Sequence, residues 1–111
     1  MRIYISGAIT NNPKYFSEFA KAQMKLYNKG YSVINPALVA QCLPDNLEHE
    51  DYMHVDFALL DLCDAIYMLK GWEQSAGANR EYGYALAKGK TIIFEQEDHK
   101  CKTSEKTKLT N

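Results

Sequence analysis

Short apolar runs alternate with longer amphipathic stretches along most of the chain. Four runs have the length and the β-branched or aromatic content of buried strands, and they lie at 3–5, 31–35, 65–69 and 91–94. Three stretches between them have helical periodicity, at 13–29, 48–62 and 75–88. The segment 37–44 is apolar and runs into Pro-Asp-Asn, which predicts a short helix or a loop.

Two of the predicted helices carry a distinct apolar face. The first has one stripe at helical spacing, which we expect to face the core: Phe16, Phe19, Ala20, Met24 and Tyr27. The second aligns Met53, Leu60 and Cys63, and Asp56 falls on the same stripe. Asp56 is therefore an acid on an otherwise apolar helix face.

Strands and helices that alternate in this way predict an α/β fold, because helix-length crossovers join parallel strands. We expect a small Rossmann-like (flavodoxin-like) three-layer sandwich with a four- to five-stranded parallel sheet. Ligands of such sheets bind beyond the carboxyl ends of the strands, next to the first strand. We expect that crevice to be lined by Tyr4, Ser6 and Gly7 at the end of strand one and by the segment 71–81 after strand three.

Composition limits the classes of protein that the chain can belong to. The 111 residues, 46% of them hydrophobic, suit one packed domain, predicted over 1–95, while the polar segment 96–111 is expected to be a flexible tail. Lys and Arg number 13 against 14 acids, a net charge of −1, which disfavours polymeric DNA or RNA as a partner. Three widely spaced cysteines favour free thiols in a cytoplasm, bacterial or of a bacterial host. The sequence contains no apolar run of the length that spans a bilayer, about 20 residues.

The loop before the last helix has features of a ligand site. Ser75 can cap that helix, whose first N–H groups favour an anion such as a phosphate or a carboxylate. Glu81 lies six residues past this cap, in the second turn, and its side chain could point back into the crevice. Taken alone, a glutamate at this position is most often a solvated residue that complements the helix dipole.

Three motifs in order resemble the nucleoside 2-deoxyribosyltransferase-like superfamily. They are the opening IYISGAI at 3–9, the helix with Asp56 that leads to Asp64-Ala65, and the segment SAGA at 75–78 followed by Glu81. The chain is most similar to the small DUF4406-type branch of phage and bacterial proteins of unassigned function, a branch similar to the 2′-deoxynucleoside 5′-monophosphate N-glycosidases. The resemblance covers residues 1–95 and leaves the tail out.

The resemblance implies N-glycosidic bond cleavage or base exchange on a 2′-deoxynucleoside or its 5′-monophosphate. It places Glu81 as the nucleophile, Asp56 as the acid for the leaving base, and Tyr4 as the residue that orients the nucleophile. An oxocarbenium-like transition state needs two carboxyl groups with separate roles. We expect burial to raise the pKa of Asp56 while Glu81 stays ionised.

The resemblance also implies a set of binding residues. Ser75 and Gly77 match the loop that holds the 5′ end of the ligand, and Ser6 with Gly7 matches a loop that faces the sugar and its phosphate. Trp72 could stack on the base or merely cover the core, and we expect it to line the pocket. The loop after strand one lacks the arginine expected of monophosphate-cleaving members, which leaves phosphate recognition open.

The expected partners are a small nucleoside or nucleotide and further copies of the chain. The resemblance implies a homodimer or a larger assembly that completes each site, and no cofactor. A metal site is not expected, because His49, His54 and Cys63 do not share one face at ligand spacing. Two other functions stay open: a non-catalytic nucleotide-binding module, and a hydrolase of another N-glycoside such as an NAD-derived nucleotide.

Overall fold

The computed structural model describes residues 1–95. The segment predicted to be a tail, 96–111, lies outside the described residues. The four predicted strands are present: β1 (Arg2–Ser6), β2 (Ser32–Ile34), β3 (Ala65–Met68) and β4 (Thr91–Phe94). The helices are α1 (Tyr15–Asn28), α2 (Pro36–Ala40), α3 (His49–Asp61) and α4 (Ala76–Ala87), with a short 3₁₀ turn, η1 (Trp72–Gln74), before α4.

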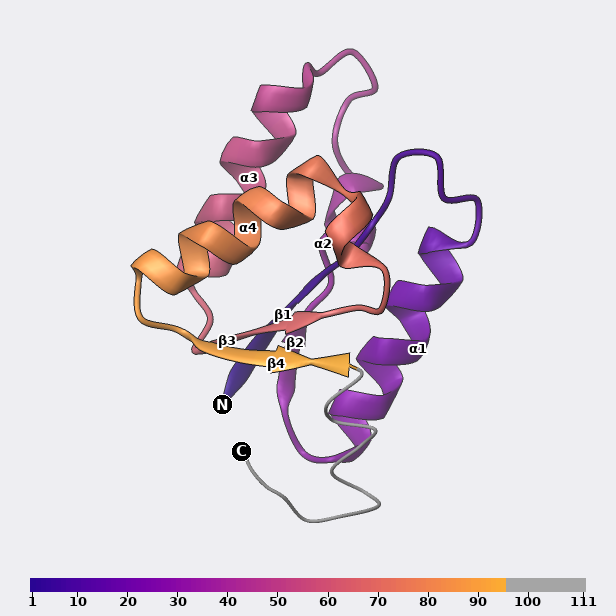
Figure 1. Ribbon diagram of the computed structural model, residues 1–111. Helices are drawn as coiled ribbons and strands as arrows, with labels where there is room; N and C mark the ends of the chain where they lie inside the picture. The colour runs from indigo at the N-terminus through magenta and orange to yellow at the C-terminus, as the bar shows by residue number, and fades with distance from the viewer. Residues whose placement is uncertain (96–111) are drawn as a thin grey trace.

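The strands form one parallel sheet in the order β2-β1-β3-β4. Figure 1 shows α3 and α4 together on one side of this sheet and α1 on the other. The predicted Rossmann-like sandwich is therefore confirmed, with four strands in the described part of the chain. Within residues 1–95, no helix combines the length and the apolar character needed to cross a membrane.

Side chains of the two central strands alternate between the two faces of the sheet, as the pleat requires. Ile3, Ile5 and Tyr67 pack on the side of α1, where Phe19 is buried. Tyr4 and Ile66 point to the opposite side, toward the layer of α3 and α4. β1 is thus buried on both faces from Ile3 onward, and Tyr4 and Ser6 lie beneath α4.

The apolar face predicted for α1 is wrong. The buried residues of this helix are Phe19, Ala22 and Leu26. Most of the predicted stripe faces outward, with exposed fractions of 43% for Phe16, 60% for Met24 and 68% for Tyr27. The sequence holds two apolar stripes that share Phe19, and packing against the sheet, rather than periodicity, decides which of them is buried.

Strand order reverses between β1 and β3, and this places the carboxyl ends of both strands at one crevice. β1 connects through α1 to β2 on one flank, while β3 connects through α4 to β4 on the other flank. The two strand ends are tied together where the backbone N–H of Leu69 donates to the carbonyl of Ser6 at 2.8 Å. The loops that leave them diverge to opposite faces of the sheet, which opens a ligand site between them.

Gly7, the first residue after β1, has no room for a side chain. A Cβ added there would lie 2.9 Å from Cδ1 of the buried Leu69. We expect Gly7→Ala to lower the free energy of unfolding by about 1–3 kcal/mol through overpacking. Urea denaturation measures this loss. Gly83→Ala is the matched control, because a Cβ in that helical position meets nothing within 4 Å and should be neutral or stabilising. Equal stability of the two variants would contradict the expectation.

Candidate active site

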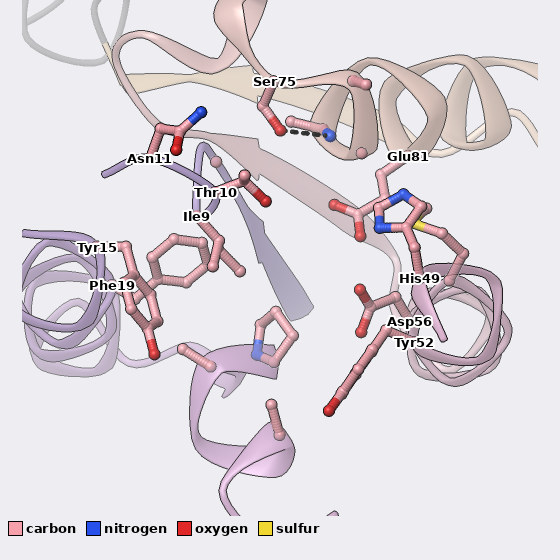
Figure 2. Close-up of a pocket in the computed structure, with 18 of the residues that line it drawn as sticks. Ile9, Thr10, Asn11, Tyr15, Phe19, His49, Tyr52, Asp56, Ser75 and Glu81 are labelled. Atoms are coloured by element: carbon pink, nitrogen blue, oxygen red, sulfur yellow. Dashed lines mark hydrogen bonds between the residues drawn. The ribbon is translucent and has the colours of Figure 1, made fainter. Parts of the chain in front are cut away.

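A cavity of about 780 Å³ lies over the carboxyl ends of β1 and β3 (Figure 2). Its walls come from the loop after β1, the start of α1, helix α2, the first two turns of α3, and the loop that enters α4. This is the crevice that the topology predicts. Five of the predicted site residues line it, namely Gly7, Asp56, Ser75, Gly77 and Glu81.

Glu81 reaches the cavity because of the way α4 begins. The Ser75 hydroxyl accepts a hydrogen bond from the backbone N–H of Ala78 at 3.1 Å, which is the predicted N-terminal cap. From that start the helix turns Glu81 inward, toward the sheet and the cavity, and only 6% of the residue is exposed. A buried carboxyl group requires partners, since an unpaired one would be costly.

Two hydroxyl groups from β1 supply those partners. The Tyr4 hydroxyl donates to Oε2 of Glu81 at 2.9 Å, and the Ser6 hydroxyl donates to Oε1 at 2.6 Å. Tyr4 and Ser6 are two residues apart on one strand, so both side chains point to the same face of the sheet. They are 0% and 1% exposed, and neither lines the cavity. Each oxygen of Glu81 is therefore held from beneath by its own donor.

Asp56 faces Glu81 from the neighbouring helix. Met53 and Leu60 anchor α3 in the core, as the predicted stripe requires, and Asp56 lies between them on that face. Figure 2 shows its carboxyl group directed toward that of Glu81 across the floor of the cavity. Two carboxyl groups from two helices thus meet above the end of β1.

Burial raises the pKa of both acids. For Glu81, burial and then the charge of Asp56 raise the pKa to about 8, against the hydrogen bonds from Ser6 and Tyr4, which lower it. For Asp56, burial raises the pKa, as predicted, and the neighbouring Glu81 and Tyr4 side chains oppose the rise. The expectation that only Asp56 has a raised pKa is therefore corrected, because the two carboxyl groups are coupled and share a proton near neutral pH. Burial, followed by the charge of Glu81, holds the pKa of Tyr4 well above its usual value, so its hydroxyl remains a donor.

The raised pKa of Glu81 makes stability depend on pH. Between its ordinary value of 4.5 and about 8, the folded chain binds a proton that the unfolded chain releases, so the free energy of unfolding falls as pH rises. We expect Glu81→Gln to remove a decline on the order of 3 kcal/mol across this range. Chemical denaturation of wild type and variant at several pH values measures the difference. Parallel pH dependences would contradict the raised pKa.

Trp72 does not line the cavity, so the expectation that it contacts the ligand is corrected. Its ring packs on Tyr82 with centroids 4.8 Å apart and on Phe94 with centroids 6.1 Å apart. The residue follows Gly71, whose φ of 88° turns the chain away from the end of β3. Trp72 therefore covers the core where α4 meets β4, which is the other possibility that the sequence left open.

Several lining residues were not predicted. His49 and Tyr52 lie on the cavity face of α3 with Met53 and Asp56, at the spacing i, i+3, i+4 and i+7. That periodicity could have identified them from the sequence. Gln74, Ala76 and Ala78 belong to the segment 71–81 that was expected to line the crevice. No local pattern marks the remaining ones: Ile9, Thr10, Asn11, Tyr15, Phe19, Pro36, Ala37, Ala40 and Gln41.

The chemistry of the cavity wall is that of hydroxyls, amides, aromatic rings and carboxyl groups. No Lys or Arg from residues 1–95 lines it, and His49 is the basic side chain at its rim. Within the same residues, no three His, Cys, Asp or Glu side chains gather in a way that could hold a metal ion. Asp56 and Glu81 are the acidic residues of this wall.

Two solved structures share this fold. The CMP N-glycosidase BcmB of Clostridium botulinum superimposes with a TM-score of 0.60 and 22% sequence identity, over 85% of this chain and 70% of that enzyme. The 2-desoxiribosyltransferase of Leishmania mexicana superimposes with a TM-score of 0.63 and 22% identity, over 84% of this chain. The chain spans 62% of the length of that transferase. No curated protein sequence matches the chain significantly.

The sequence matches a protein family over nearly all of the described residues. Residues 1–94 match the family described as a domain of unknown function, DUF4406. The matched region begins at Met1 and ends at the last residue of β4, so it includes every element that builds the cavity. The chain belongs to the DUF4406 family, and its fold is that of the nucleoside 2-deoxyribosyltransferase-like proteins.

Proposed function

We propose that the protein cleaves or exchanges the N-glycosidic bond of a 2′-deoxynucleoside or its 5′-monophosphate, with Glu81 as the nucleophile and Asp56 as the acid. One observation carries the proposal. A carboxyl group that is 6% exposed, with a hydroxyl donor on each oxygen, faces a second carboxyl group across a cavity floor. A solvated glutamate that merely complements a helix dipole needs none of these contacts.

The reaction follows from the two carboxyl groups. Glu81 attacks C1′ of the sugar, and the electron pair of the C1′–N bond leaves with the base, which takes a proton from Asp56. In the reactive arrangement the proton held by the pair therefore lies on Asp56. Water then attacks C1′ to complete hydrolysis, or a second base attacks to complete exchange, and the attacking molecule gives its proton to the Asp56 carboxylate. In both cases the C1′–O electron pair returns to Glu81, which is regenerated as a carboxylate.

Size and relatives support a small nucleoside as the ligand. The cavity of about 780 Å³ lies within the range of small-molecule sites, roughly 300–1,000 Å³. Two of the solved structures that share the fold are named as an N-glycosidase of CMP and a deoxyribosyltransferase. Both names describe breakage of the bond between a sugar and a base, which is the reaction that we propose here.

The 5′ end of the ligand is assigned to the start of α4. Ser75 and Gly77 line the cavity there, beside the first backbone N–H groups of the helix. A Cβ at Gly77 would lie at ordinary contact distance, 3.6 Å from Sδ of Met53. We expect Gly77→Ala to fold normally, because the position is helical, but to raise KM about tenfold by filling this end of the cavity. Steady-state kinetics measures the effect against Gly83→Ala, and an unchanged KM would move the 5′ end elsewhere.

Association of the chain with itself is part of the proposal. Phe16, Met24 and Tyr27 form an exposed apolar stripe on the outer face of α1, which supports a contact between copies. We retain the homodimer or larger assembly, in a cytoplasm, as the expected form. Light scattering on the purified protein tests it, and a monomer at micromolar concentration would count against it.

The direct test is release of free base. Purified protein is incubated with a panel of deoxynucleosides and their 5′-monophosphates, with and without a second base, and the products are separated by chromatography. We expect base release without the second base if water is the acceptor, and a new nucleoside if a base is the acceptor. The preferred 5′ group also decides whether the site acts without the arginine expected of monophosphate-cleaving relatives. Ligand binding without release would instead favour a nucleotide-binding module.

A further inference from the structure

The two carboxyl oxygens of Glu81 have different hydrogen-bond donors, because Ser6 donates to Oε1 and Tyr4 donates to Oε2. We infer that Ser6 holds Oε1 throughout the reaction, which leaves Oε2, the partner of Tyr4, as the oxygen that bonds to the sugar. The inference rests on the proposed function. It makes Ser6 a positioning residue beneath the nucleophile, in place of the contact with the ligand that the sequence predicted for it.

The contact between Ser6 and Oε1 is short and fixed. The hydroxyl donates at 2.6 Å, a length typical of a strong hydrogen bond to a carboxylate. Ser6 is 1% exposed, and its carbonyl is tied to the N–H of Leu69 at 2.8 Å, so the end of β1 cannot swing away. Within residues 1–95, Oε1 of Glu81 is the one acceptor that the structure gives this hydroxyl.

The Tyr4 hydroxyl lies beside a second carboxyl group. It donates its one proton to Oε2 of Glu81 at 2.9 Å, and Asp56 is near enough for its charge to raise the pKa of Tyr4. Once an oxygen of Glu81 is bonded to carbon as an ester, it becomes a weak acceptor, and its donor needs another partner. Tyr4 can turn to Asp56, which has become a carboxylate by giving its proton to the base. Ser6 has no such alternative and would be left buried and unpaired if Oε1 reacted.

With this assignment, Ser6 donates a hydrogen bond to Oε1 in both steps of the reaction. In the first step the C1′–Oε2 bond forms, the C1′–N bond breaks, and Oε1 becomes the ester carbonyl oxygen that still accepts from Ser6. In the second step the oxygen of water bonds to C1′, its proton passes to Asp56, and the C1′–Oε2 electron pair returns to Glu81. Negative charge then reappears on the carboxylate, and a fixed donor on Oε1 stabilises it. Loss of the donor should slow this second step most.

The test compares Ser6→Ala with Ser6→Cys, whose thiol is a weaker donor, and with Ser32→Ala, a matched change on an exposed residue of the edge strand β2. We expect Ser6→Ala to lower kcat about 100-fold with little change in KM, and Ser6→Cys to fall between it and wild type. Near neutral pH, where the pair holds the one proton that Asp56 gives to the base, Ser6→Ala should release a burst of base and accumulate a sugar ester that mass spectrometry finds on Glu81. The acid limb of the pH profile of kcat/KM should also move to higher pH, because a hydrogen bond that lowers the pKa of Glu81 is gone.

The outcomes separate the inference from the proposed function. A wild-type protein that releases no base from any nucleoside overturns the function, and the inference with it. An active wild type with an unaffected Ser6→Ala, or with equal slowing of burst and turnover, overturns the inference alone. NMR titration of ¹³C-labelled glutamate carboxyls tests the hydrogen bond between Ser6 and Glu81 independently of catalytic activity. The Glu81→Gln variant is used to assign the resonance of Glu81. An unchanged titration of Glu81 in folded Ser6→Ala also overturns the inference.

Discussion

Glu81→Gln is expected to abolish base release, with kcat reduced about 10⁴-fold or more. The amide has no charge and cannot form the ester with C1′, and its NH₂ group cannot accept from the hydroxyl that faces it. Tyr4 and Ser6 both donate to Glu81, so one of the two must lose its acceptor in the variant. Chromatographic base release with the best substrate of the panel measures the loss.

The same substitution should leave the fold intact. Glutamine has nearly the volume of glutamate, and it removes a buried acid whose pKa is raised to about 8, so stability above that pH should be maintained or improved. The control is Glu73→Gln, an exposed glutamate in η1 that should keep full turnover and full stability. Wild-type activity in Glu81→Gln would return this residue to the solvated helix glutamate that a sequence pattern alone suggests.

Elements with strong local patterns were predictable from the sequence. β1 and β3 are continuous apolar runs bounded by Gly and Asp, and both lie where they were expected. The Ser75 cap fixes the register of α4, and the register in turn places Glu81 on the inner face of the helix. These predictions depend on interactions between residues that are close in the sequence, which explains why they hold.

Predictions that needed contacts between distant elements were less successful. The rotation of α1 is set by the sheet beneath it, and two apolar stripes compete for the core, so the pattern favoured Met24 where the structure buries Ala22. Trp72 lies near the site in sequence, but its ring packs on Tyr82 and Phe94, where α4 meets β4, and not in the cavity. In both cases contacts with residues far away in the sequence determine which side chains are buried and where they pack.

The electrostatics of the site could not be predicted for the same reason. The sequence places an acid on α3 and another on α4 but does not say that they face one another, and this juxtaposition helps to raise the pKa of Glu81. It also does not say that the Ser6 hydroxyl turns under Glu81, away from the cavity. Most residues of the candidate site could be identified from the sequence. The structure was needed to show how they are protonated, and which of them line the cavity and which are buried beneath it.

Asp56→Asn is the second substitution with a large expected effect. An asparagine at this position cannot protonate the leaving base, and loss of a positioned general acid costs about 10²–10⁴-fold in rate. The charge of Asp56 also raises the pKa of Glu81, so its removal should lower that pKa and move the acid limb of the pH profile to lower pH. Steady-state rates of base release over a range of pH measure both effects in one variant.

A change of leaving group separates proton donation from packing. A 7-methylated purine deoxynucleoside carries a positive charge on its base, which can depart without a proton, so Asp56→Asn should cost less than about tenfold with this substrate. Asp61→Asn, on the outer side of α3 where Asp61 accepts from the Tyr84 hydroxyl at 2.7 Å, is the control and should keep the wild-type rate with both substrates. An equal loss with neutral and methylated bases would mean that Asp56 orients Glu81 or the sugar without giving up a proton. Because burial already favours the protonated form of Asp56, the larger loss is expected with the neutral base.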